Sequence, residues 1–164
     1  MIPSNEKLIK SLESLARDAF IQIESYNYMA NFWANSYIYS GILTTVLSSI
    51  SSASSLSTLV ESNIAPGILA AAVAVFSAIA TFVNPSEKAS QHRKAKDKFV
   101  LIYAKARNVA VDTLSEDTNE VTQKLKEELK DLSNKIAEAA QTSPQVPEWV
   151  RQIAEKRTKS RFVF

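Results

Sequence analysis

A serine-rich stretch carries the side chains of this sequence whose type and spacing are most suggestive of chemistry. On a helix, five hydroxyl residues recur at steps of four and three and form one stripe: Thr44, Ser48, Ser51, Ser55 and Thr58. Such hydroxyls can line a water-filled lumen and solvate ions there. They can equally form a close-packed seam of small residues with weak hydrogen bonds between helices. The pattern leaves both interpretations open, and one helix can serve both purposes.

The stripe lies in a part of the chain that is almost free of charge. The sequence has no charged residue between Glu24 and Glu61, and again none between Glu61 and Glu87. Residues 64–83 are apolar all round, and as a helix they reach about 30 Å, the thickness of the hydrocarbon core of a bilayer. Residues 36–60 form a first, less apolar span. Because the connector between them is so short, the two spans are predicted to form an antiparallel hairpin.

Two further features of the spans are candidates for a role in a channel. The second span carries a stripe of small residues that we expect to pack against the first span or a neighbouring subunit: Gly67, Ala71, Ala74, Ala78 and Thr81. Glu61 is the only acidic residue near the spans. It is a candidate for a ring of charge at an outer pore mouth, or for an ordinary solvated loop charge.

The residues that flank the hairpin predict its orientation. The second span is followed by a cluster of basic residues, Lys88, Arg93, Lys94, Lys96 and Lys98, whereas the connector between the spans has none. The positive-inside rule therefore places both termini in the cytoplasm and the connector outside. Four of these bases, together with one histidine, are candidate contacts for anionic lipid or for a nucleotide phosphate: Lys88, His92, Arg93, Lys94 and Lys96.

The sequence predicts an all-α integral membrane protein, with amphipathic cytoplasmic helices around the hairpin. Four parts follow one another along the chain: 1–35, 36–83, 84–141 and 142–164. The first is an amphipathic helix that runs into the first span with little or no break, and the last is a proline linker with a short helix and a basic tail. Asn84, Pro85 and Glu87 have the pattern of a helix start. The Asn84–Pro85 break is therefore a candidate hinge between the second span and the cytoplasmic helices.

The composition argues against several classes of protein. The chain has 164 residues with no cysteine, one histidine and two glycines, and its net charge is only +2. These counts disfavour thiolate or histidine metal sites and glycine-rich phosphate loops. A nucleic-acid partner is not expected from so small a charge. No catalytic constellation stands in a plausible setting, so we expect no enzyme, no metal and no cofactor.

The exit of the second span resembles the SLATT domains. A long two-span hairpin is followed there by Pro85, Ala89, His92 and Tyr103 on one continuing helix, and the resemblance covers about residues 5–140. It implies a bacterial effector of the inner membrane that forms pores in antiphage defence and so depolarises or permeabilises the infected cell. It also implies partners of two kinds, a nucleotide second messenger with its synthase, or a sensor protein.

Three hypotheses follow for the function of the chain. In the first, several copies assemble into an oligomeric pore, because two spans cannot enclose a channel alone. In the second, the hairpin is an anchor without conductance, and the cytoplasmic helices are a scaffold that recruits partner proteins. In the third, a soluble bundle holds the hairpin buried and inserts it only when triggered.

Overall fold

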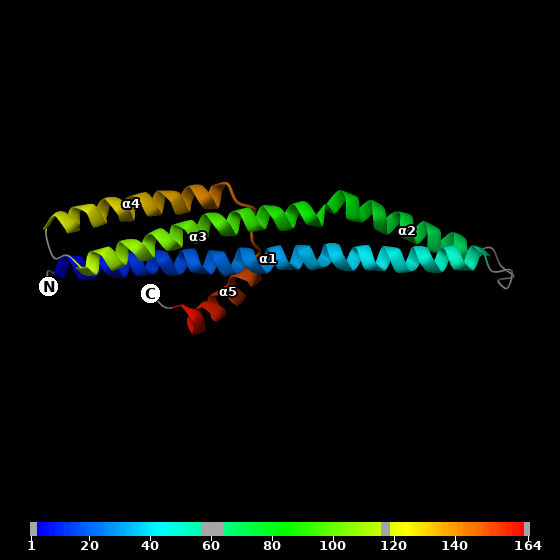
Figure 1. Ribbon diagram of the computed structural model, residues 1–164, viewed down its shortest axis with the longest axis horizontal. Helices are drawn as coiled ribbons and strands as arrows, with labels where there is room; N and C mark the ends of the chain where they lie inside the picture. Colours follow the sequence, from blue (N-terminus) through cyan, green and yellow to red (C-terminus); the bar gives the residue numbers. More distant parts are fainter. Residues whose placement is uncertain (1–2, 57–63, 116–118, 163–164) are drawn as a thin grey trace. The chain divides into compact units, whose positions relative to one another are not determined.

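The computed structural model describes residues 3–56, 64–115 and 119–162, and every regular element in these ranges is a helix. Five helices follow one another (Figure 1): α1 (Pro3–Leu56), α2 (Ile64–Val83), α3 (Pro85–Ser115), α4 (Asn119–Gln141) and α5 (Glu148–Arg161). The expected all-α class is therefore confirmed over the described residues.

The chain forms two compact units. Unit 1 consists of Met1–Ala30 with Ser90–Phe164, and unit 2 consists of Asn31–Ala89. Both boundaries fall inside helices. The 54 residues of α1 correspond to about 80 Å of uninterrupted helix, so the amphipathic segment runs into the expected first span without a break.

Unit 1 has a continuous hydrophobic core. The side chains of Leu12, Phe99 and Leu132, from α1, α3 and α4, are fully buried and belong to one cluster. Helix α5 also buries Val150 and Ala154, which are not members of that cluster. Each helix buries one apolar stripe with a period of three to four residues, which is the pattern by which helices pack into a bundle.

Unit 2 consists mainly of two antiparallel helices with almost no core of their own. The second half of α1 and α2 lie side by side and run in opposite directions (Figure 1). Only Pro85 and Ala89 are buried among the residues of this unit whose side chains are described. Two predicted site residues, Thr58 and Glu61, lie outside the described residues, and so does the side chain of Ser55.

The junction between α2 and α3 is a single residue, Asn84, with φ 43°. This left-handed conformation ends α2, and asparagine tolerates it better than most residues. The Asn84 side chain donates a hydrogen bond to Glu87 Oε2 over 2.7 Å, and the backbone N–H of Glu87 points back to Asn84 Oδ1 over 3.4 Å. Pro85 occupies the first turn of α3, where a missing N–H costs nothing. The helix start predicted from the sequence is therefore confirmed.

Candidate functional site

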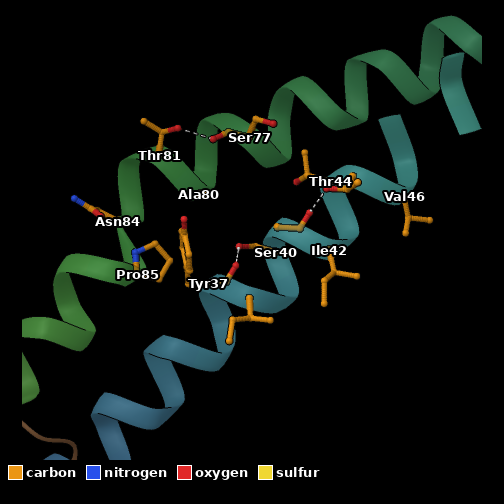
Figure 2. A pocket seen from close by; sticks show the side chains of 13 residues that line it. Tyr37, Ser40, Ile42, Thr44, Val46, Ser77, Ala80, Thr81, Asn84 and Pro85 are labelled. Atoms are coloured by element: carbon orange, nitrogen blue, oxygen red, sulfur yellow. Dashed lines mark hydrogen bonds between the residues drawn. The ribbon is translucent and has the colours of Figure 1, made fainter. Parts of the chain in front are cut away.

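An open groove of about 840 Å³ lies in unit 2, between residues 37–46 of α1 and the last turns of α2. Figure 2 shows the ring of Tyr37 pointing across it towards Ala80 and Pro85, whereas Ile42 points away from α2. Thr44 and Ser77 face each other farther along the two helices. The lining is mostly apolar with scattered hydroxyls, which is the composition of a surface that can meet lipid or another helix.

The described part of the predicted hydroxyl stripe faces α2. Thr44, Ser48 and Ser51 are half-buried, and Thr44 lines the groove between the two helices. Thr45, of the neighbouring line, lines the same groove. The partial cover of Thr44, Ser48 and Ser51 is compatible with an interhelix seam in a single hairpin.

A second line of hydroxyls lies beside the first and is exposed. It consists of Thr45, Ser49 and Ser52, which are one residue out of step with the predicted stripe. Each hydroxyl donates a hydrogen bond of 2.9 Å to the carbonyl oxygen four residues earlier, on Gly41, Thr45 and Ser48 respectively. The donors are therefore satisfied within the helix, and the oxygen lone pairs remain available as acceptors.

The small-residue stripe of α2 has two expected partners, the first span and a neighbouring subunit, and the single chain bears only on the first. The predicted small-residue stripe is exposed at every described position: Gly67, Ala71, Ala74, Ala78 and Thr81. The half-buried residues of α2 with described side chains are instead Leu69, Ala72, Val73, Ser77, Ala80 and Val83. The small stripe therefore is not buried against the first span in this structure.

The outer surface of unit 2 is apolar. Thirteen of the seventeen exposed large hydrophobic side chains in the described residues lie between Phe32 and Phe82, and Phe82 itself is 90% exposed. One stretch, Gly67–Asp112, which begins within α2, is long and apolar enough to cross a membrane, and none of its most apolar 18 residues is buried. Among the described residues, the first expected span does not pass the same test.

An aromatic and a basic side chain meet at the base of unit 2. The Lys88 ammonium lies over the ring of Trp33, 4.5 Å from its centroid, and Phe32 packs edge-on against the same ring at 5.4 Å. A cation held over an indole is an attractive pair, and both side chains are typical of the headgroup level of a bilayer.

The other predicted anion contacts are dispersed. His92 is 4% exposed and lies in unit 1 beside Tyr26, with ring centroids 5.9 Å apart. Lys96 is 3.7 Å from Asp97, while Arg93 and Lys94 are exposed. The structure therefore does not gather these residues into one cluster, and it buries the histidine in the helical core.

Unit 1 contains an ion network between α3 and α4. Lys105 Nζ lies 2.7 Å from Glu128 Oε2 and 2.8 Å from Asp131 Oδ2, and Lys135 reaches the same Asp131 oxygen over 2.7 Å. The hydrogen bond between Lys105 and Asp131 raises the pKa of Lys105 above its usual value and lowers the pKa of Asp131 below its own. The network ties α3 to α4 and is a structural feature that the sequence analysis did not identify.

The side chains described here offer no obvious place for a metal, since no group of three or more histidine or acidic residues gathers among them. The arrangement that remains is an apolar hairpin with hydroxyl faces in unit 2 and a packed helical core in unit 1. Comparison with known protein families, curated proteins and solved structures finds no match to this chain.

Proposed function

We propose that this chain is a pore-forming effector whose hairpin crosses a bacterial inner membrane and whose copies assemble into an ion-conducting oligomer. The observation that carries the proposal is the exposed apolar surface of unit 2. A surface with thirteen exposed large hydrophobic side chains and almost no core beneath it is unfavourable in water. Hydrocarbon is the environment that such a surface fits.

The second half of α1 is proposed as the first span, although it is the less apolar of the two. The hydroxyls of Thr45, Ser49 and Ser52 donate back to their own helix, so little hydrogen-bonding capacity is left unsatisfied in lipid. The apolar side chains around them include Ile42, Val46 and Ile50, which are all exposed. A two-span hairpin thus satisfies its backbone internally, as any segment that spans a bilayer must.

The exposed hydroxyl line is the proposed lumen face of the oligomer. A hairpin cannot enclose a channel, so several copies must contribute one helix each to a ring. Hydroxyl oxygens whose hydrogens are engaged with backbone carbonyls present lone pairs, which solvate cations rather than anions. We therefore expect a pore that favours cations, with Thr45, Ser49 and Ser52 facing the ions and Thr44, Ser48 and Ser51 against α2.

The biological setting of the proposal comes from the resemblance to the SLATT domains. Both termini and unit 1 would lie in the cytoplasm, and opening during phage infection would depolarise or permeabilise the cell. The trigger would be a nucleotide second messenger or a sensor protein that acts on unit 1. The Asn84–Pro85 junction is the candidate hinge, because Asn84 is the single non-helical residue between α2 and α3.

The proposal is tested by ion efflux from liposomes that contain the purified protein, together with its mass in detergent. Ser49→Leu is expected to abolish efflux while the oligomer persists, because the leucine would block the lumen face. Ser48→Leu is expected to disturb the hairpin and the assembly, since Ser48 is half-buried. Ser160→Leu is the matched control, because Ser160 is exposed, donates to the carbonyl oxygen of Arg157 three residues earlier over 2.9 Å, and lies outside the hairpin.

Three outcomes would count against parts of this proposal. Undiminished efflux in Ser49→Leu would remove that residue from the lumen face. A monomer without efflux would exclude an oligomeric channel. An oligomer that never conducts, with or without added nucleotides, would favour the membrane-anchored scaffold, and a partner recovered with the full chain would then identify its role.

A further inference from the structure

Two adjoining cavities lie in unit 1 between α3, the end of α4 and the linker that follows it. They share Lys98 and Thr142. The larger, about 500 Å³, is also lined by Lys94 and Gln141, and the smaller, about 410 Å³, has an apolar wall that includes Leu101. Both volumes fall within the range of about 300–1,000 Å³ that is typical of small-molecule sites.

The larger cavity is positively charged. Lys94 and Lys98 lie one helical turn apart on the same face of α3, where two like charges repel each other. Its lining contains no acidic side chain, and its other polar groups are amides and hydroxyls that can donate hydrogen bonds. An anion placed between the two ammonium groups would relieve their repulsion.

The two lysines of the larger cavity differ from Lys105 and Lys135, which line only the smaller one. Lys105 and Lys135 are neutralised by carboxylates of α4. Among the described residues, no carboxylate forms an ion pair with Lys94 or Lys98. Lys98 Nζ instead donates to the neutral hydroxyl oxygen of Thr142 over 2.8 Å. A phosphate oxygen is a stronger acceptor for an ammonium group than this hydroxyl is.

From this arrangement we propose that the cavity binds a phosphate-bearing small molecule. Lys94 and Lys98 bind the phosphate, and the Gln141 side-chain amide acts as a neutral donor to its oxygens. The apolar wall at Leu101 accepts the uncharged body of the ligand. The site goes beyond the proposed pore, because binding requires neither a membrane nor conductance.

The linker beside the cavity makes binding measurable. Thr142 directly follows α4, and two residues later the carbonyl oxygen of Pro144 accepts a hydrogen bond of 3.2 Å from the hydroxyl of Tyr26. The linker leads into α5, where Trp149 packs edge-on against Tyr28 with ring centroids 5.7 Å apart. A ligand that replaces Thr142 as the hydrogen-bond acceptor of Lys98 therefore changes the surroundings of the linker. The linker leads directly to the fluorescent side chain of Trp149.

The test is a titration of the full chain in detergent with sodium pyrophosphate at constant ionic strength. Thermal stability and Trp149 fluorescence, the latter in a Trp33→Phe background, report binding. We expect a saturable rise in the unfolding temperature of the wild type. Both Lys94→Gln and Lys98→Gln should bind pyrophosphate at least about tenfold more weakly than the wild type. Lys130→Gln is the matched control, because Lys130 is exposed on α4 and lines neither cavity.

Lys94→Gln keeps the test independent of folding, since no hydrogen bond or ion pair among the described residues involves that ammonium group. Equal pyrophosphate binding by wild type, Lys94→Gln and Lys98→Gln would overturn the proposal, and so would the lack of a saturable response. A second arm uses phosphatidylcholine vesicles with and without phosphatidic acid. Binding that requires phosphatidic acid, without any response to pyrophosphate, would assign the lysines to a lipid headgroup and overturn the soluble ligand.

Discussion

Replacement of Phe99 by alanine should destabilise unit 1 severely. The Phe99 side chain is fully buried and stacks on Tyr26, with ring centroids 5.5 Å apart and an interplanar angle of 17°. Truncation of a buried phenylalanine removes apolar contacts and leaves a cavity, at a cost of about 3–5 kcal/mol. Because the stacked pair is also lost, we expect about 4 kcal/mol or more. Single domains are stable by only about 5–15 kcal/mol, so this is a large fraction of the total.

The matched control is Phe82→Ala, which makes the same chemical change on the surface of α2. Phe82 is 90% exposed, so its truncation removes few contacts within the chain. We expect a change within about 0.5 kcal/mol in the unfolding of unit 1. The pair therefore separates a residue that the chain itself buries from one that only a surrounding membrane would cover.

The assay is urea unfolding of the full chain in a mild detergent, in a Trp33→Phe background. Emission from Trp149 reports whether α5 stays packed on α1, because that indole lies against Tyr28. With a slope of about 2 kcal/mol per molar urea, a loss of about 4 kcal/mol lowers the midpoint by about 2 M. A loss below about 1 kcal/mol for Phe99→Ala, or equal losses for the two variants, would refute the assignment of the core.

Three further perturbations test other parts of the structure. Asn84→Val places a β-branched residue at positive φ and removes the helix cap, so hydrogen exchange in the first turn of α3 should accelerate by an amount equivalent to about 2 kcal/mol. Tyr26→Phe removes the hydrogen bond to Pro144 and should lower the free energy of unfolding by about 1 kcal/mol, with faster proteolysis in the linker. The hydrogen bond from Lys105 lowers the pKa of Asp131, so this carboxylate stabilises the fold above its usual pKa of about 4, and that stability is lost as the pH falls through the lower folded value. Wild type should therefore lose stability below about pH 4 more steeply than Asp131→Asn, as measured by unfolding at several pH values.

Part of the proposed site could be predicted from the sequence because it depends on local rules. The helix start at Asn84 follows from the order Asn, Pro and Glu, whose groups satisfy one another within a single turn. The apolar α2 follows from the lack of charge over twenty residues. Neither feature needs a contact with a distant part of the chain.

The choice between hydroxyl faces could not be made in the same way. Thr44, Ser48 and Ser51 recur at the same steps as Thr45, Ser49 and Ser52, so the serine-rich segment carries two equivalent lines. Helical periodicity identifies both lines and ranks neither. The distinction appears only in the folded chain, where Thr44, Ser48 and Ser51 are half-buried and Thr45, Ser49 and Ser52 are exposed.

The cationic cavity shows the same division between local pattern and long-range packing. The sequence shows many lysines after the second span, but it does not show which of them find a carboxylate. Lys105 is neutralised by residues of α4, whereas Lys98 meets Thr142, 44 positions away in the sequence. Charge density is a local property of the sequence. Charge compensation depends on which helices meet, so the sequence by itself determined the helices and their apolar stretches, and only the tertiary structure decided which side chains are covered, paired or left to bind a partner.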